Sequence, residues 1–214
     1  MMTSADAMPL HELLAQGGWA MYPIYACSVL TVGVFLKKIF ELRAARLHDV
    51  AWVEGVVEHA LRGELDAAHR ACRTVVHPGA RVVAAQVHAL DEAPSQAEAE
   101  AKRVATLELT KLESGINLLS FLAQVSPLLG LLGTVLGMVE MFMGLQGAGD
   151  GNIAIGDLAS GIWKALLTTA AGLTVAVPAL AGYSYLGSRV DQVRLQIVDA
   201  VQRVTFAAGR AGGR

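Results

Sequence analysis

Residues 124–186 read QVSPLLGLLGTVLGMVEMFMGLQGAGDGNIAIGDLASGIWKALLTTAAGLTVAVPALAGYSYL, and this stretch decides the fold. Two apolar runs flank a short loop, residues 146–156, that contains four glycines and no Lys or Arg. Each run is close to the roughly 20 apolar residues that a helix needs to cross a bilayer. The pattern predicts two antiparallel transmembrane helices joined by a hairpin loop.

Unusual residues of the two helices fall at matching depths. In an antiparallel pair, residues at equal depth have position numbers that add to a constant, because each helix rises about 1.5 Å per residue. The sums run from 303 to 305 for three pairs: Thr134 with Thr169, Glu140 with Lys164, and Pro127 with Pro178. We therefore expect the hydroxyls to lie level near mid-membrane, the charges nearer the loop, and the prolines in the other half.

The composition predicts a membrane protein with a third span. The chain of 214 residues is 54% hydrophobic, with a mean hydropathy of +0.46, and residues 17–36 carry no charge. Of the 17 Lys and Arg, 16 lie in residues 37–111 and 189–214. Because basic residues favour the cytoplasmic side, we expect the N-terminus and the loop outside and the C-terminus inside.

These observations predict an all-α membrane protein with long helices that extend into a cytoplasmic helical bundle. The expected order is a periplasmic segment (1–16), a first span (17–37), a cytoplasmic helical module (38–113), a second span (114–145), a periplasmic loop (146–156), a third span (157–187) and a cytoplasmic helix and tail (188–214). The first span has no strongly polar residue, so we expect it to be a lipid-facing brace.

Turn residues divide the cytoplasmic module. Gly63 predicts a turn, and His77-Pro78-Gly79 predicts a break. The Ser95-Gln96-Ala97-Glu98 sequence has the capping-box pattern of a helix start. We expect one helix to run from Ser95 through the second span.

No motif predicts an enzyme, a metal site or a cofactor. The six histidines lack metal-ligand spacing, and no nucleophile, P-loop or dinucleotide motif is present. Cys27 lies in the first span and Cys72 in the cytoplasmic module, so a disulfide between them is excluded and both are expected to be packing residues.

The polar residues inside the spans have two readings. Glycines and other small residues follow helical spacing in both spans, which suits close helix packing. Pro127 and Pro178 each free the carbonyl four residues earlier, and freed carbonyls beside hydroxyls also suit a hydrated path. Glu140 and Lys164 are predicted to pair between the spans, and independent snorkelling to the membrane surface is the alternative.

The hairpin resembles the ExbB/TolQ/MotA family of proton-channel subunits. The matching segments are residues 127–137 (PLLGLLGTVLG), 165–173 (ALLTTAAGL) and 177–179 (VPA), and residues 63–72 are similar to the family's cytoplasmic turn. The resemblance covers about residues 18–195, and the three-span layout is similar to the ExbB/TolQ branch. Where many members have a Glu, this chain has Lys164.

The resemblance implies a homopentamer in the bacterial inner membrane around an ExbD/TolR-like dimer of single-span proteins. That partner supplies an aspartate, and a TonB- or TolA-like protein receives the force. The family's pore threonines correspond to Thr134 and Thr169, with Thr168 beside them. Membrane lipid surrounds such an assembly, and no nucleic acid is expected as a partner.

Two other functions stay open at this point. The chain can be a non-conducting membrane scaffold, in which the small residues and prolines serve assembly only. It can also be a stator of a flagellar or gliding type, which differs mainly in its partner and coupling ion. The residues themselves favour half of a proton motor, because no carboxylate lies at mid-membrane and a hydroxyl does not titrate in this range.

Overall fold

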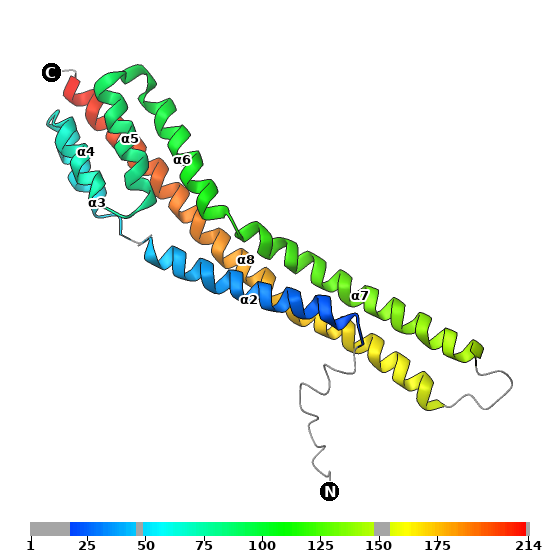
Figure 1. The fold of residues 1–214 in the computed structure, drawn as a ribbon. Helices are drawn as coiled ribbons and strands as arrows, with labels where there is room; N and C mark the ends of the chain where they lie inside the picture. Colours follow the sequence, from blue (N-terminus) through cyan, green and yellow to red (C-terminus); the bar gives the residue numbers. More distant parts are fainter. Residues whose placement is uncertain (1–17, 46–48, 148–154, 213–214) are drawn as a thin grey trace, which may run out of the picture. The chain divides into compact units, whose positions relative to one another are not determined.

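The computed structural model describes residues 18–45, 49–147 and 155–212, and every regular element in these ranges is a helix. The predicted all-α fold is confirmed, including three helices long and apolar enough to span a membrane. Figure 1 shows α2 (Met21–Ala44), α3 (Trp52–Leu61), α4 (Leu65–Arg73), α5 (Pro78–Glu92), α6 (Ala97–Glu113), α7 (Ile116–Gly147) and α8 (Ile155–Gly212), with a short 3-10 helix η1 (Pro94–Gln96) before α6. The predicted N-terminal segment and most of the predicted periplasmic loop lie outside the described residues.

The chain divides into two compact units. The first, which we call the membrane unit, joins Met1–Phe35 with Leu118–Tyr183. The second, which we call the helical module, joins Leu36–Asn117 with Ser184–Arg214. The 58-residue helix α8 contributes to both units, which agrees with the expected extension of membrane helices into a bundle.

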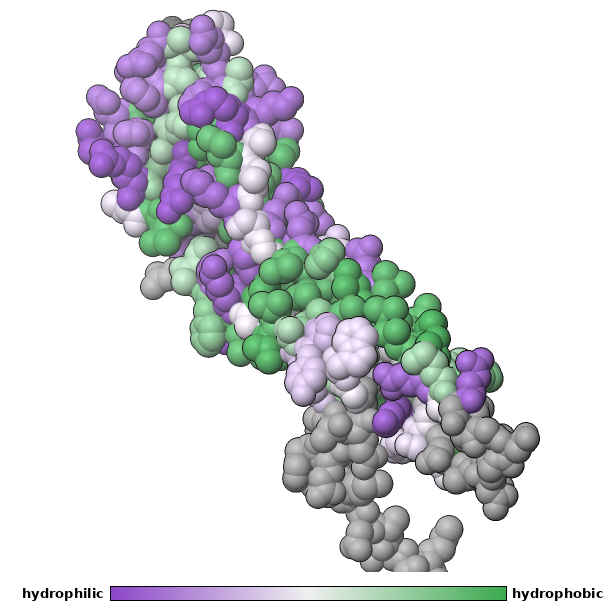
Figure 2. Space-filling model, turned by 45° about the vertical axis from the view of Figure 1, so that its right-hand side comes forward, coloured by the Kyte–Doolittle hydropathy of each residue, from purple (hydrophilic) through white to green (hydrophobic). Residues whose placement is uncertain are grey.

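The membrane unit presents apolar side chains outward. Only 22% of the apolar window in α2 is buried, and 33% of the window in α7. The visible surface of this unit is mostly hydrophobic, whereas that of the helical module is mostly hydrophilic (Figure 2). Trp19 and Tyr22, at the start of the first span, are also exposed, as expected of aromatic residues at a membrane boundary.

The helix that contains most of the predicted first span begins at Met21 and ends at Ala44. Gly18 has a φ of 68°, a left-handed conformation that glycine adopts without strain, and its carbonyl accepts from the Met21 amide at 3.2 Å. This turn sets the helix start at Met21, and the helix continues to Ala44. It passes Lys37 and Lys38 without a break because lysine is a good helix former.

The helical module has its core between α3, α4, α5 and the C-terminal part of α8 (Figure 1). Ala60, Ala68 and Ala80 are fully buried there, and their small side chains let the helices approach closely. Gln86 of α5 adds a polar link, since its Nε2 donates to the Val201 carbonyl at 3.1 Å and to Thr205 Oγ1 at 2.7 Å.

Cys72 belongs to this core. Its side chain is buried in α4 among the apolar residues of the module. Burial raises the pKa of the Cys72 thiol to about 12, because desolvation disfavours the thiolate. The thiol therefore stays protonated at neutral pH, and both described cysteines are free and buried, in agreement with a packing role.

The prediction of one continuous helix from Ser95 through the second span is wrong. Helix α6 ends at Glu113, Ser114 has an extended ψ of 130°, and Gly115 has a φ of 85°. The buried side chain of Lys38 fixes this break: its Nζ donates to the Leu112 carbonyl at 3.4 Å and pairs with Glu41 at 2.8 Å. A cation at the C-terminus of a helix is favourable because the unpaired carbonyls are there.

The predicted capping box is also wrong. Ser95 lies inside η1, and α6 starts with Gln96 as an N-cap that makes no side-chain cap bond. Pro94 lies at the first position of η1 and keeps this segment in a tighter turn. The break at residues 77–79 is confirmed as a helix start, with Pro78 at the first position of α5 and the His77 side chain accepting from the Gly79 amide at 3.0 Å.

Replacing Gly115 with alanine tests the break between α6 and α7. We expect Gly115→Ala to lower the free energy of unfolding by about 1 kcal/mol or more, because a side chain is strained at a φ of 85°. The matched control is Gly55→Ala in the interior of α3, where a methyl group meets no atom within 4 Å. There, alanine should stabilise by roughly 0.5–1 kcal/mol. Thermal unfolding of the purified chain in detergent measures both, and equal stability of the two variants would contradict the role of Gly115.

Candidate functional site: the seam between α7 and α8

Small residues line the contact of α7 with α8 inside the membrane unit, and we call this contact the seam. It is formed by Ser126, Gly130, Gly133 and Gly137 of α7 and by Gly161, Ala165, Thr168 and Gly172 of α8. Both sets repeat at intervals of four and three residues, so each set occupies one face of its helix. The predicted stripe of small residues therefore packs one span against the other.

The two backbones approach so closely that the seam excludes larger residues. A Cβ atom at Gly172 would lie 2.5 Å from the Ser126 carbonyl oxygen, and one at Gly130 would lie 2.9 Å from the Thr168 carbonyl oxygen. Neither neighbour is a flexible side chain that can move aside. Transmembrane helices associate through this kind of close packing, because lipid tails leave no hydrophobic driving force between them.

Three threonines predicted for the proton pathway lie at or beside the seam. Thr168 is 1% exposed, and its hydroxyl donates to the Ala165 carbonyl at 2.8 Å and lies 3.4 Å from that of Gly130. The half-buried Thr169 donates to the Gly130 carbonyl at 3.2 Å. The half-buried Thr134 donates to the Leu131 carbonyl at 2.6 Å. The hydroxyls of Thr134 and Thr169 thus bind adjacent carbonyls of α7.

The observed register differs slightly from the predicted one. Gly133 meets Thr168 and Gly137 meets Ala165, so the numbers of facing residues add to 301 and 302. Thr134 accordingly lies level with about position 167, an offset of roughly 3 Å from Thr169 at 1.5 Å per residue. The Thr134 and Thr169 hydroxyls do not bond to each other. Both bind carbonyls in the same turn of α7.

The predicted polar partners nearer the loop are not joined. In the described part of the chain, no ion pair links Glu140 with Lys164. Glu140 is exposed and Lys164 is half-buried beside the seam. Pro127 and Pro178 lie inside α7 and α8, as predicted, and the helices continue through both.

The first span is mostly exposed, as expected of a lipid-facing brace, and it also has a packed face. One face of α2 is buried, with Met21, Ile24, Cys27 and Thr31 at helical spacing. Thr31 is 6% exposed, and its hydroxyl has no hydrogen-bond partner in the described chain. The same spacing was visible in the sequence, but an apolar run gives no contrast between a lipid-facing and a packed face.

The seam holds no cluster suited to a metal. Within residues 18–45, 49–147 and 155–212, no group of three or more His, Cys, Asp or Glu is placed to hold an ion. The site offers instead hydroxyls and backbone carbonyls between apolar helices, which can pass or solvate a proton.

Three helices long and apolar enough to span a membrane, with hydroxyls at the contact of two of them, define a multi-span helical membrane protein. The sequence model of the MotA/TolQ/ExbB proton channel family matches residues 50–198. The chain belongs to this family.

Similar proteins include some named ExbB and some named TolQ. The biopolymer transport protein exbB1 of Vibrio cholerae is 34% identical over 92% of this chain and 87% of its own length. A putative ExbB homolog of Methanothermobacter thermautotrophicus is 28% identical over 91% of this chain and 68% of its own. The Tol-Pal system protein TolQ of Haemophilus influenzae is 41% identical over 40% of this chain and 37% of its own.

Replacing Gly133 tests the close packing of the seam. A Cβ atom at Gly133 would lie 2.6 Å from Thr168 Oγ1 and 2.7 Å from its Cβ, so Gly133→Ala should destabilise the chain by about 1–3 kcal/mol through overpacking. Gly144→Ala is the matched control on the same helix, because a methyl group there meets nothing within 4 Å. Thermal unfolding in detergent compares them. Combining Gly133→Ala with Thr168→Gly should recover part of the loss, and no recovery would refute the proposed contact.

A charge exchange tests the predicted pair of Glu140 and Lys164. Glu140→Lys or Lys164→Glu alone would bring two like charges together if the two residues face each other, as their matching depths predict. If the two residues pair in the assembled protein, within a chain or between copies, the double exchange should restore the yield of membrane-inserted protein that either single change lowers. Quantitative blotting of the membrane fraction measures this yield, and independent losses that add in the double variant would favour snorkelling.

Proposed function

We propose that this chain is a proton-channel subunit that converts the proton motive force into mechanical work together with a single-span partner. The partner is of the ExbD/TolR kind, and a TonB- or TolA-like protein receives the force. Membership of the proton channel family and similarity to proteins named for biopolymer transport and for the Tol-Pal system support this proposal.

One observation carries the proposal. The hydroxyls of Thr134 and Thr169 bind neighbouring carbonyls of α7 and remain partly accessible in the isolated chain. A hydroxyl both donates and accepts, so it can pass a proton or solvate one. Thr168 is different: its hydroxyl is enclosed in the seam, and we assign it to packing against Gly133.

The partner is required because this chain lacks a proton-binding carboxylate at mid-membrane. In the apolar parts of α7 and α8, residues 117–139 and 165–188 contain no Asp or Glu. A proton moving inward releases about 2.3 kcal/mol per 100 mV. This energy does work only if binding and release of the proton move a coupled element, and we assign that element to the aspartate-bearing partner.

We place the protein in the bacterial inner membrane, with its N-terminus in the periplasm and its C-terminus in the cytoplasm. The gathering of 16 of the 17 basic residues in residues 37–111 and 189–214 supports this orientation. The assembly we propose is a homopentamer surrounding a dimer of the single-span partner. The largely exposed apolar helices of the membrane unit leave room for contacts with other copies and with lipid.

Removing the two hydroxyls tests the proposed function. Thr134→Val combined with Thr169→Val keeps side-chain volume and removes both hydroxyls, so proton flux should be abolished while assembly is kept. The chain is purified with its partner, reconstituted into vesicles, and proton uptake under an imposed potential is followed with a pH-sensitive dye. Native mass spectrometry reports whether the assembly is intact.

The matched control is Thr174→Val, because the Thr174 hydroxyl is exposed and donates to the Ala170 carbonyl of its own helix at 2.8 Å. This variant should conduct like the unmodified protein. Full proton flux in the double variant would overturn the proposed pathway and favour a non-conducting scaffold. Loss of the assembly in the double variant would assign the two threonines to packing.

A further inference from the structure

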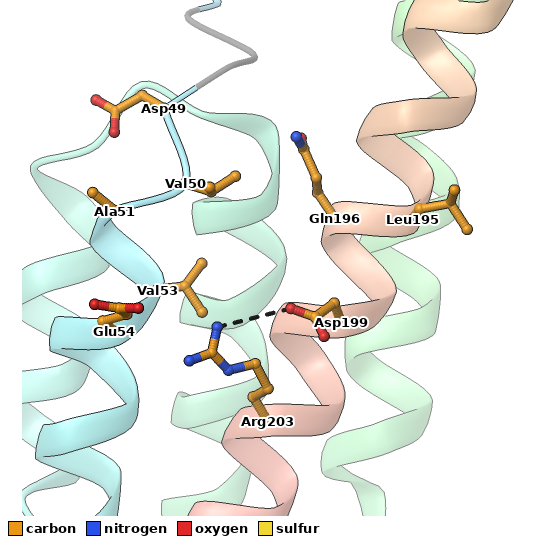
Figure 3. A pocket seen from close by; sticks show the side chains of 9 residues that line it. All are labelled: Asp49, Val50, Ala51, Val53, Glu54, Leu195, Gln196, Asp199 and Arg203. Carbon is orange, nitrogen blue, oxygen red and sulfur yellow. Dashed lines mark ion pairs between the residues drawn. The ribbon is translucent and has the colours of Figure 1, made fainter.

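A groove lies within the helical module, beside the start of α3. It has a volume of about 650 Å³ and is lined by residues 49–51, by Val53 and Glu54 of α3, and by Leu195, Gln196, Asp199 and Arg203 of α8. Figure 3 shows Arg203 extending from α8 toward α3, with Val50, Val53 and Glu54 on the opposite side. The groove is separate from the seam, because all of its residues belong to the helical module.

The lining combines apolar side chains with carboxylates. Val50 and Leu195 are 41% and 70% exposed and supply apolar surface to the lining. Among the described lining residues, Asp49, Glu54 and Asp199 supply three carboxylates and Arg203 supplies one cation. Apolar contact together with uncompensated negative charge is the chemistry that binds Lys or Arg side chains, whose stems are apolar and whose ends are charged.

The carboxylates of the groove are largely available to a partner. Arg203 approaches Asp199 only at 3.9 Å, as an i,i+4 contact on the surface of α8, and such exposed pairs are weak. Asp49 and Glu54 make no ion pair in the described chain. The buried Gln196 Oε1 also lacks a hydrogen-bond donor. The described lining therefore carries a net negative charge and favours cations over phosphates and other anions.

The position of the groove indicates where its occupant comes from. Arg189 is the first basic residue after the apolar part of α8, and Leu195 and Arg203 follow it by roughly 9 and 21 Å along the helix at 1.5 Å per residue. An extended peptide covers about 3.3 Å per residue. A segment of a few residues that leaves the membrane near Arg189 can therefore reach the groove.

We propose that the groove binds the basic cytoplasmic flank of the single-span partner. This identification of the occupant rests on the proposed function. A protein with one span carries its Lys and Arg next to the membrane on the cytoplasmic side, so its flank has the charge and the position that the groove requires. Docking there holds the flank while the partner's span moves inside the membrane.

A binding experiment tests the groove with a defined probe. The full chain, purified in detergent, is titrated with a fluorescent peptide of alternating lysine and glycine, and binding is followed by anisotropy. The combined variant Asp49→Asn, Glu54→Gln and Asp199→Asn should weaken binding about tenfold, because each surface ion pair changes affinity a few-fold. The matched control neutralises two Asp and one Glu elsewhere on the module, Asp66→Asn, Asp91→Asn and Glu98→Gln, which are also exposed, and should change binding less than twofold.

Crosslinking then identifies the occupant in the complex. A zero-length carbodiimide joins carboxylates to lysines, and mass spectrometry should find Glu54 or Asp199 linked to the partner's cytoplasmic flank. Links only to lysines of another copy of this chain would overturn the proposal and make the groove a contact between copies. Equal weakening of peptide binding in both combined variants would also overturn it, because the attraction would then be general.

Proton flux separates this proposal from the proposed function. Peptide binding to the groove in a protein that conducts no protons would contradict the proton-channel function. It would still support the groove as a binding site for a basic segment. Intact proton flux with no peptide binding and no crosslink to the flank would overturn the proposed docking site and leave the proposed proton-channel function standing.

Discussion

The close approach of the α7 and α8 backbones is the constraint on which the membrane unit depends. At Gly130, Gly133 and Gly172 the helices leave no room for a methyl group. This closeness brings the Thr169 hydroxyl of one helix to the Gly130 carbonyl of the other. Larger residues would separate the helices, and the hydroxyl would then lose its acceptor on α7. The same residues therefore determine both the packing of the two helices and the arrangement of the proposed proton path.

The depth comparison recovered this arrangement nearly correctly from the sequence. It placed Thr134 and Thr169 level, and in the structure they bind adjacent carbonyls of one helix turn. The method works because two unbroken antiparallel helices have a register fixed by their common rise per residue. It did not find that Thr168 is enclosed, since depth says nothing about the direction in which a side chain points.

The errors of the sequence reading have a common physical cause. Gly115 has no proline beside it, and a lone glycine inside a helical pattern is compatible with either a helix or a break. The break between α6 and α7 is favoured by a residue distant in the sequence. The buried Lys38 ammonium donates to the Leu112 carbonyl, which lies at the C-terminus of α6. The burial of Thr31 likewise depends on neighbouring helices. Local sequence patterns contain neither interaction.

The interlocking of Gly133 with Thr168 limits how the two spans can move. The Thr168 side chain packs against Gly133, whose side chain is a single hydrogen atom. Sliding α7 along α8 would press the Thr168 side chain against the backbone on either side of Gly133. The two helices therefore behave as one rigid pair. In the assembly that we propose, motion during a working cycle is therefore expected at the surfaces between chains and in the single-span partner.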